Sequence, residues 1–184
     1  MALFGIHLES EGEQRALGIV FRVDTRTETY TIALKDDTFK PPANARFPLG
    51  INGIRVFDDH LYYANSFRPV CGRMPIDRVS GKATGPYKVI STNIMADDFA
   101  IDKTVTAHMA AGLANEIVEV KPGGRSCVIA GSVGSMLVAG PTSTVFGRTR
   151  EDTRVLYVST SGPQGSSVNG TCTEGGKIVA LEIR

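Results

Sequence analysis

Few residues of this chain have the type and spacing that chemistry requires, and most of those carry oxygen. Asn52, Asp97 and Thr142 follow one another at equal intervals of 45 residues. Amide and carboxylate oxygens suit hard cations such as Ca²⁺ or Mg²⁺. A carboxylate can also act as a general base toward water. The candidate site residues, including the polar neighbours of these three, are Asn52, Asn65, Asp97, Asp98, Thr142 and Ser143.

The histidines and cysteines do not form a recognisable site. The histidines are scattered, without the i,i+4 pairing of a metal site or a partner pattern for a catalytic triad. The cysteines lie far apart and lack a CxxC spacing, so they indicate neither a disulfide framework nor a zinc site. We interpret the histidines as structural or solvent-facing, and the cysteines as small core or surface residues. These residues are His7, His60, His108, Cys71, Cys127 and Cys172.

Each candidate also has an ordinary structural explanation. Asn52 precedes Gly53, and an Asn-Gly pair often makes a turn. Either carboxylate of Asp97 and Asp98 could satisfy backbone N–H groups in a loop. Side chains such as Asn65 and Thr142 could tie strands together rather than approach a ligand. The sequence leaves these alternatives open.

The elements that must position these residues are β-strands. Short runs rich in Val, Ile, Tyr and Thr alternate with Gly, Pro, Asp and Asn, which is typical of an all-β fold. The runs recur with the period of 45 residues, four to a cycle, and this favours propeller blades over a β-sandwich, where strands are also closely spaced. The expected strands are 18–24, 29–34, 51–56, 60–65, 72–77, 87–90, 97–102, 105–109, 116–120, 126–130, 142–146, 155–159 and 177–183, with residues 3–8 as an optional strand before them.

The strands group into a single partial propeller domain over residues 1–184. It contains about three and a half blades, too few to close a six-bladed ring. The expected blades are a partial one at 1–38, complete ones at 50–90 and 95–131, and one at 139–184 that lacks its outer strand.

Several segments together resemble the gluconolactonase-like (SMP-30-like) propeller family, especially its fungal members. Residues 49–54 with 61–66 resemble a blade that opens on an N-G-[IL] motif before an aromatic strand. Residues 97–102 resemble the family's acidic blade opening, and residues 139–149 with 156–160 resemble its last full blade. The similarity covers roughly residues 18–184, the C-terminal part of such a propeller.

The resemblance implies a divalent cation, Ca²⁺ or Mg²⁺, held by a Glu, an Asn and an Asp on innermost strands. By position Asn52 matches the Asn and Asp97 the Asp, so both are expected metal ligands. Asp97 is also the expected catalytic base. The matching Glu belongs to an earlier blade, and Glu9, Glu11 and Glu13 are in the wrong phase to replace it. The metal site is therefore expected to be incomplete in this chain.

Three functions follow as alternatives. The first is metal-assisted hydrolysis of a lactone or related cyclic ester, a hydrolase activity. The second is a metal-independent tailoring step of fungal secondary metabolism, in which a pocket steers a reactive intermediate through a hetero-Diels–Alder cyclisation. The third is a propeller that binds without chemistry. In the first two, Asn65, Asp98, Thr142 and Ser143 are expected to contact a small-molecule substrate.

Charge and hydropathy limit the classes of partner that the chain is expected to bind. Twenty basic residues against nineteen acidic ones give no field that favours nucleic acid or an anionic membrane. No apolar run has the roughly 20 residues of a membrane helix. The start is apolar but short and lacks a basic flank, so no signal peptide is visible and a cytoplasmic location is favoured. Open blade edges predict a homo-oligomer or pairing with a complementary propeller half.

Overall fold

The computed structural model describes residues 2–6, 18–45, 49–162, 168 and 174–183. The chain forms two compact units, Met1–Asn93 and Ile94–Arg184. Each unit is built from antiparallel sheets whose strands follow one another in sequence order.

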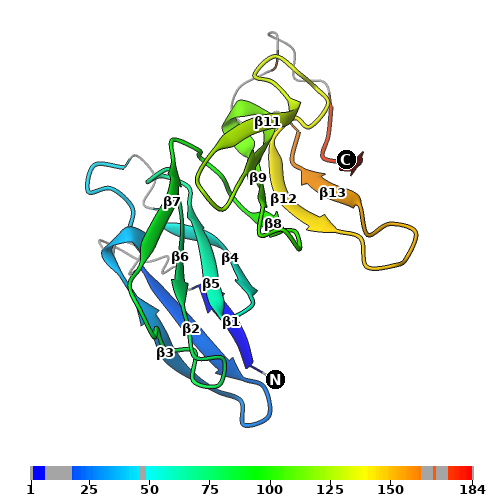
Figure 1. The fold of residues 1–184 in the computed structure, drawn as a ribbon. Coiled ribbons are helices and arrows are strands. Elements are labelled where there is room, and N and C mark those ends of the chain that lie inside the picture. The colour runs from blue at the N-terminus through cyan, green and yellow to red at the C-terminus, as the bar shows by residue number, and fades with distance from the viewer. Residues whose placement is uncertain (1, 7–17, 46–48, 163–167, 169–173, 184) are drawn as a thin grey trace. The chain divides into compact units, whose positions relative to one another are not determined.

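The first unit contains two sheets, with three and four strands (Figure 1). All neighbouring strands are antiparallel. The strands are β1 (Ala2–Ile6), β2 (Ile19–Asp24) and β3 (Thr29–Lys35) in the first sheet, then β4 (Ile51–Phe57), β5 (His60–Asn65), β6 (Val70–Pro75) and β7 (Lys88–Thr92) in the second.

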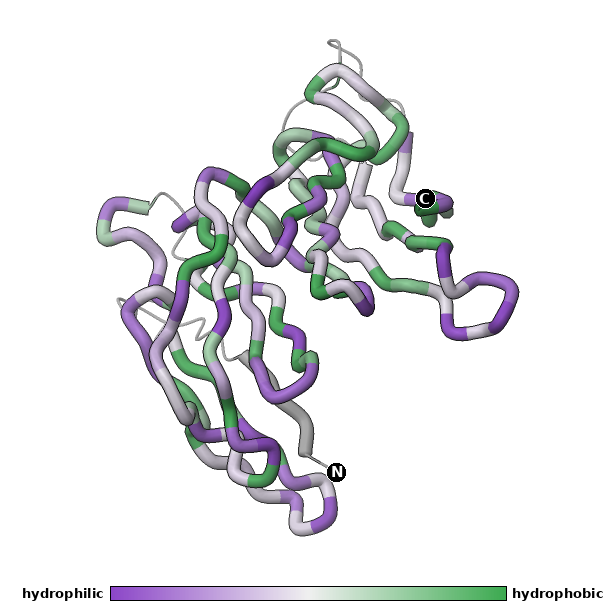
Figure 2. The backbone as a smooth tube through the Cα atoms, viewed as in Figure 1, coloured by the Kyte–Doolittle hydropathy of each residue, from purple (hydrophilic) through white to green (hydrophobic). Residues whose placement is uncertain are grey.

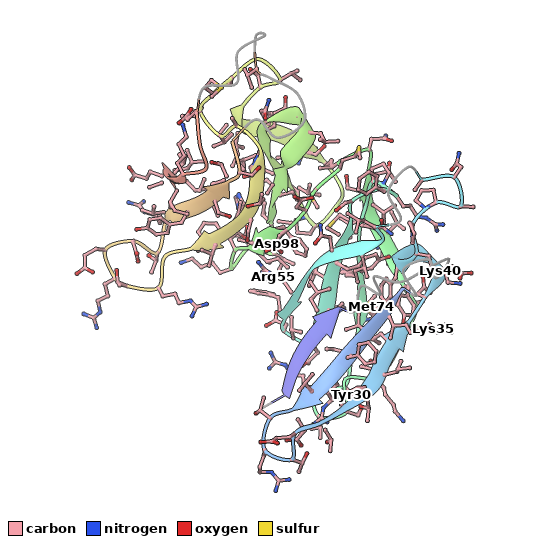
Figure 3. The ribbon with its side chains drawn as sticks, turned by 180° about the vertical axis from the view of Figure 1, so that it is seen from behind. Tyr30, Lys35, Lys40, Arg55, Met74 and Asp98 are labelled. Carbon is pink, nitrogen blue, oxygen red and sulfur yellow. The ribbon has the colours of Figure 1, made fainter. Side chains whose placement is uncertain are left out.

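The two sheets of this unit share one apolar core, in which the segment after β3 takes part. Phe39 is wholly buried, and its ring meets the edges of Tyr63 and Tyr87 at centroid distances of 4.8 and 5.5 Å. Met74 lies inside this unit, whereas Tyr30 is exposed on β3 (Figure 3). The core residues are Val20, Leu34, Phe39, Ile51, Leu61, Tyr63, Met74 and Ile76.

The second unit also contains two sheets, of four and three strands, again with each strand antiparallel to the next. Its core lies between these sheets and is made of Ala100, Ala110, Ile117, Val138, Leu156 and Val158. The strands are β8 (Phe99–Ile101), β9 (Ala107–Ala111), β10 (Glu116–Val120) and β11 (Ser126–Gly131) in the third sheet, then β12 (Pro141–Phe146), β13 (Val155–Thr160) and β14 (Ile178–Glu182) in the fourth.

Burial along the strands explains why the sequence forms them. On β13 every second residue is buried, the period of a strand with one face on the core. Strand β9, in the interior of its sheet, is buried at all five positions. Figure 2 shows short hydrophobic and hydrophilic stretches following one another along the backbone of each unit.

The helices within the described residues are single turns. They are the 3₁₀ segments η1 (Asp37–Phe39) and η2 (Gly112–Ala114). Asp36 caps the first by accepting a bond from Thr38 N, as N-cap carboxylates do. No helix in the described part of the chain is long and apolar enough to cross a membrane.

The strands lie close to the expected segments, with one clear difference before β9. Val105 was expected to begin that strand but lies in a turn with φ of 63°. The Asp102 carboxylate accepts bonds from the backbone N–H groups of Thr104 and Thr106 at 2.8 and 3.0 Å. This local turn delays the strand to Ala107.

Candidate functional site

The same β-bulge recurs at the start of the first strand in three consecutive sheets. On β4, Ile51 pairs with Asn65 and Ile54 with Tyr63, so two residues, Asn52 and Gly53, stand opposite one. A bulge of this kind bends the strand and re-aims its side chains, and bulges are enriched beside active sites.

The second bulge contains the two adjacent aspartates. Asp97 N donates to Ala110 O at 3.0 Å, and Ala110 N donates to Asp98 O at 2.9 Å. Both aspartates therefore stand opposite a single residue of β9, just before β8 begins. Figure 3 shows Asp98 at this end of the second unit.

The third bulge lies on β12. Pro141 pairs with Thr160 and Ser143 with Ser159, so Thr142 is the extra residue. The interval of 45 residues thus has a backbone cause, since it returns the chain to the same irregular position at each blade opening. The bulge places an amide, a carboxylate and a hydroxyl at equivalent points of their own sheets.

In the second unit the structure brings two predicted residues into direct contact. Ser143 Oγ donates a hydrogen bond to Asp98 Oδ2 at 2.6 Å, so the first strand of the fourth sheet is tied to that of the third. Charge-assisted bonds of this length are the strong ones. Both side chains are half-buried.

Thr142 is held within its own sheet by a pair of hydroxyls. Its Oγ1 lies 2.9 Å from Ser159 Oγ, and either oxygen can donate. Thr142 Oγ1 also donates to Ser159 O at 3.3 Å. When Ser159 Oγ donates to Thr142, the Thr142 hydroxyl can turn its proton from this long bond to another acceptor. Ser159 was not a predicted site residue, because only strand pairing brings it to the bulge.

Gly112, in the β9–β10 turn, lies close to the Asp97 side chain. A Cβ added at Gly112 would lie 3.7 Å from Asp97 Oδ2 and 3.1 Å from Pro141 O. The β9–β10 turn therefore closely approaches both the aspartate bulge and the start of β12.

In the first unit, Asn52 and Asn65 have different surroundings. Asn52 is exposed and its Nδ2 donates to Ser66 Oγ at 3.1 Å. Asn65 is wholly buried. Its Nδ2 donates to Thr38 O and Lys40 O, each at 2.9 Å, and its Oδ1 accepts from Arg68 N at 3.0 Å. This geometry favours the strand-tying alternative for Asn65, whereas a ligand contact at Asn65 stays a prediction.

A contact between a buried histidine and a partly exposed aspartate lies at the other end of β8 and β9, and sequence reasoning missed it. His108 is wholly buried, with Nε2 at 3.2 Å from Asp102 Oδ2 and its ring edge-on to Phe146. Thr144 Oγ1 donates to His108 O at 2.7 Å. The contact between His108 and Asp102 depends on the turn that precedes β9. A separation of six residues matches no sequence motif that would have predicted it. Burial of His108 contradicts the solvent-facing alternative, and a structural role for it stays a prediction.

Hydrogen bonding sets the charge state of that aspartate. Burial raises the pKa of Asp102, but hydrogen bonds from Thr104, Thr106 and His108 outweigh this effect. Together they hold the pKa of Asp102 below its ordinary value of 3.8.

A metal site at Asn52 and Asp97 stays a prediction. The two residues belong to different units. Their oxygens have the chemistry that a hard cation takes, but two ligands are fewer than the 6–8 that Ca²⁺ usually binds. Among the described residues, no group of three His, Cys, Asp or Glu side chains could hold a metal ion. Glu9, Glu11 and Glu13 lie outside the residues that the structure describes, as do His7 and Cys172.

Two curated fungal proteins are similar to this chain in sequence. A candidate hetero-Diels–Alderase of a Phoma species is 32% identical over 155 residues, which cover 77% of this chain and 42% of that protein. A second candidate hetero-Diels–Alderase, from Sarocladium schorii, is 30% identical over 158 residues, with 77% and 39% covered. The chain thus spans about two fifths of the length of these relatives. No protein-family profile matches it.

Solved propellers of the gluconolactonase-like type share its fold. A luciferin-regenerating enzyme aligns with a TM-score of 0.63 at 12% identity, over 88% of this chain and 50% of its own. The calcium-binding protein regucalcin of Agrobacterium tumefaciens aligns with a TM-score of 0.62 at 17% identity, covering 90% and 54%. A gluconolactonase of Xanthomonas campestris gives 0.54 at 10% identity, covering 76% and 40%. The expected all-β, gluconolactonase-type propeller fold is therefore confirmed.

Proposed function

We propose that this chain forms part of the pocket of a tailoring enzyme that steers a hetero-Diels–Alder cyclisation. The sequence similarity to the two candidate hetero-Diels–Alderases supports this proposal. The structural observation that carries it is the hydroxyl pair of Thr142 and Ser159 at a blade-opening bulge. Such a pair offers a positioned hydrogen-bond donor, and the resemblance to gluconolactonase-like propellers implies that it lies near the mouth of the central channel.

The reaction needs little from the protein beyond position and polarity. A C=C–C=O heterodiene adds to an alkene, forming one C–C and one C–O bond and leaving a new C=C in a dihydropyran. All atoms of both reactants are retained, and no oxidant or leaving group is involved. Holding the partners together supplies much of the acceleration.

A hydrogen bond to the heterodiene oxygen supplies the remainder. It withdraws electron density from the heterodiene and strengthens as charge develops on oxygen in the transition state. Thr142 Oγ1 can make this bond when Ser159 Oγ donates to it and its own proton turns from Ser159 O to the heterodiene oxygen. Asp98 is held by Ser143 and helps to fix the neighbouring strand.

The test is a stereochemical assay on the purified chain. A benzylidene diketone serves as heterodiene and 2-hydroxyethyl vinyl ether as alkene, with the dihydropyran resolved by chiral chromatography. Without a catalyst the product is racemic, so an enantiomeric excess reports reaction in a protein pocket. We expect an excess that survives dialysis against EDTA and is reduced in Thr142→Val.

A matched control distinguishes the proposed role of Thr142 from a general effect of removing one hydroxyl of a hydroxyl pair. Thr27 Oγ1 and Thr29 Oγ1 also lie 2.9 Å apart, in the exposed β2–β3 turn. Thr27→Val should leave the enantiomeric excess unchanged. A racemic product from the folded wild-type chain would overturn the proposal.

Lactone hydrolysis is the second candidate, favoured by the Asp97 carboxylate at the second bulge. In this alternative, oxygens of Asn52 and Asp97 would hold a divalent cation, and the Asp97 carboxylate would serve as general base toward water. The cation would polarise the lactone carbonyl. Hydrolysis of glucono-1,5-lactone that depends on Ca²⁺ or Mg²⁺ and is lost in Asp97→Asn would favour it over cyclisation. Absence of both activities would leave a binding role.

A further inference from the structure

The end of the third sheet that carries the aspartate bulge also carries two ordered loops. The first is the β9–β10 turn, η2 followed by Asn115, and the second is the β11–β12 connection over residues 132–140. Register places both at this end, since Glu116 pairs with Ala111 on one side and with Gly131 on the other.

Asn115 fastens these two loops to each other. It adopts the left-handed conformation, with φ of 55° and ψ of 42°, which Asn tolerates better than most residues. Its Nδ2 donates to Val133 O at 3.0 Å, and its Oδ1 accepts from Gly140 N at 2.8 Å. The Asn115 residue is only 8% exposed. One buried amide thus holds both ends of the β11–β12 loop.

A third bond holds the middle of that loop. Lys177 Nζ, at the start of the last strand, donates to Met136 O at 3.0 Å. Val138 of the same loop is wholly buried in the core of the second unit, so the loop is a fixed feature of that unit.

Large apolar side chains project from these fixed loops. Leu113 is 67% exposed, Val133 68% and Leu137 49%, and the β11–β12 loop includes hydrophobic stretches in Figure 2. Single exposed apolar residues are ordinary. Here three of them lie on loops joined by one buried amide, and Leu113 directly follows the glycine that approaches the Asp97 carboxylate.

We propose that Leu113, Val133 and Leu137 form an apolar rim that binds the hydrocarbon part of the alkene in the proposed cyclisation. This inference rests on the proposed function and adds a substrate class to it, an alkene with an apolar substituent. The rim adjoins the bulge through Gly112, so an alkene could contact the rim and still reach the reacting heterodiene. Burial of the alkene substituent against fixed side chains provides the driving force.

Two alkenes of different polarity test the rim by kinetics. Styrene is the apolar alkene and 2-hydroxyethyl vinyl ether the polar one, each with the benzylidene diketone. Leu113→Ser should raise KM for styrene about fivefold to tenfold, because a partly buried leucine contact is lost. KM for the vinyl ether should stay within about twofold, since that alkene gains little from apolar contact.

Two further variants sharpen the comparison. Asn115→Gly keeps the left-handed conformation but removes both side-chain bonds, so it should impair styrene use with Leu113 still present. Val79→Ser is the control, because Val79 is 77% exposed and follows β6 at the end of its sheet away from the Asn52 bulge. It should change KM for neither alkene.

A binding measurement tests the apolar rim independently of any catalytic activity. The chain is labelled at its leucine and valine methyl groups and titrated with styrene alone. We expect the methyl resonances of Leu113, Val133 and Leu137 to shift together, and that of Val79 to remain. Rim shifts without any cyclisation would support the rim and contradict the proposed function. Cyclisation without rim shifts, or an equal loss of both alkenes in Leu113→Ser, would overturn the rim alone.

Discussion

Ser143 Oγ donates to Asp98 Oδ2 across 2.6 Å, and both residues occupy the second position of a bulge, in consecutive sheets. The bond therefore joins two blade openings side chain to side chain. A neutral hydroxyl bound to a carboxylate in a half-buried setting contributes more than a typical surface contact.

Removal of this hydroxyl should lower stability measurably. Ser143→Ala is expected to reduce the free energy of unfolding by about 1.5–3 kcal/mol, because a bond to a charged group is lost. The measurement is urea unfolding followed by circular dichroism. Ser80→Ala is the control, since Ser80 Oγ donates to Asp77 at 2.7 Å in an exposed turn. A similar loss in both variants would show that the link between the two sheets adds nothing.

Gly72 should be intolerant of any side chain. A Cβ at this position would lie 2.5 Å from Tyr63 Cζ, and Tyr63 is wholly buried in the core of the first unit. Gly72→Ala should therefore destabilise the protein by about 1–3 kcal/mol through overpacking.

Thermal unfolding of Gly72→Ala and Gly123→Ala provides the comparison. A Cβ at Gly123 would meet nothing within 4 Å, so that variant should stay within about 1 kcal/mol of wild type. Equal stability of the two variants would mean that Tyr63 can move aside.

The Asp102–His108 pair should contribute to acid sensitivity. The pKa of Asp102 is below its ordinary value of 3.8 in the folded protein. The stability that it contributes is therefore complete above 3.8 and is lost as the pH falls through the lower folded-state pKa. Asp102→Asn should lower stability at neutral pH and flatten the decline on acidification.

Urea unfolding at a series of pH values from about 6 to about 2 measures this effect. The decline should weaken without vanishing, because Asp77 and Asp152 also have lowered pKa values. An unchanged acid dependence in Asp102→Asn would assign the sensitivity to those other carboxylates.

Self-association through the first sheet is a further prediction. Tyr30 and Ile32 are 71% and 56% exposed on β3, and the Phe21 ring lies edge-on to Tyr30 at 5.6 Å. An exposed apolar surface of this kind favours association. Ile32→Lys should shift a wild-type dimer toward monomer in sedimentation at matched concentration, whereas Val79→Lys should not. A monomeric wild-type chain would contradict the prediction.

Sequence alone predicted the strands and their period, because alternation and turn residues are local signals. It also selected Asn52, Asp97 and Thr142, although the bulge that relates them is a matter of strand pairing. The hydrogen-bond partners of Asn65 and the His108–Asp102 contact could not be predicted from sequence. Both depend on the conformation of a loop that brings residues together in space. Asn115 gave no sign of its role, because a left-handed asparagine is recognisable only from backbone angles.

The first bulge has a consequence for the chemical stability of the Asn52 side chain during storage. Asn52 is exposed and followed by glycine, the pairing in which the next backbone nitrogen most readily attacks the side-chain amide carbon and expels ammonia, giving a succinimide. Hydrolysis of that ring would leave aspartate or isoaspartate, replacing an amide that donates to Ser66 with a negative charge. Stored protein would therefore change at a blade opening, and the product would appear as an acidic species in ion-exchange chromatography.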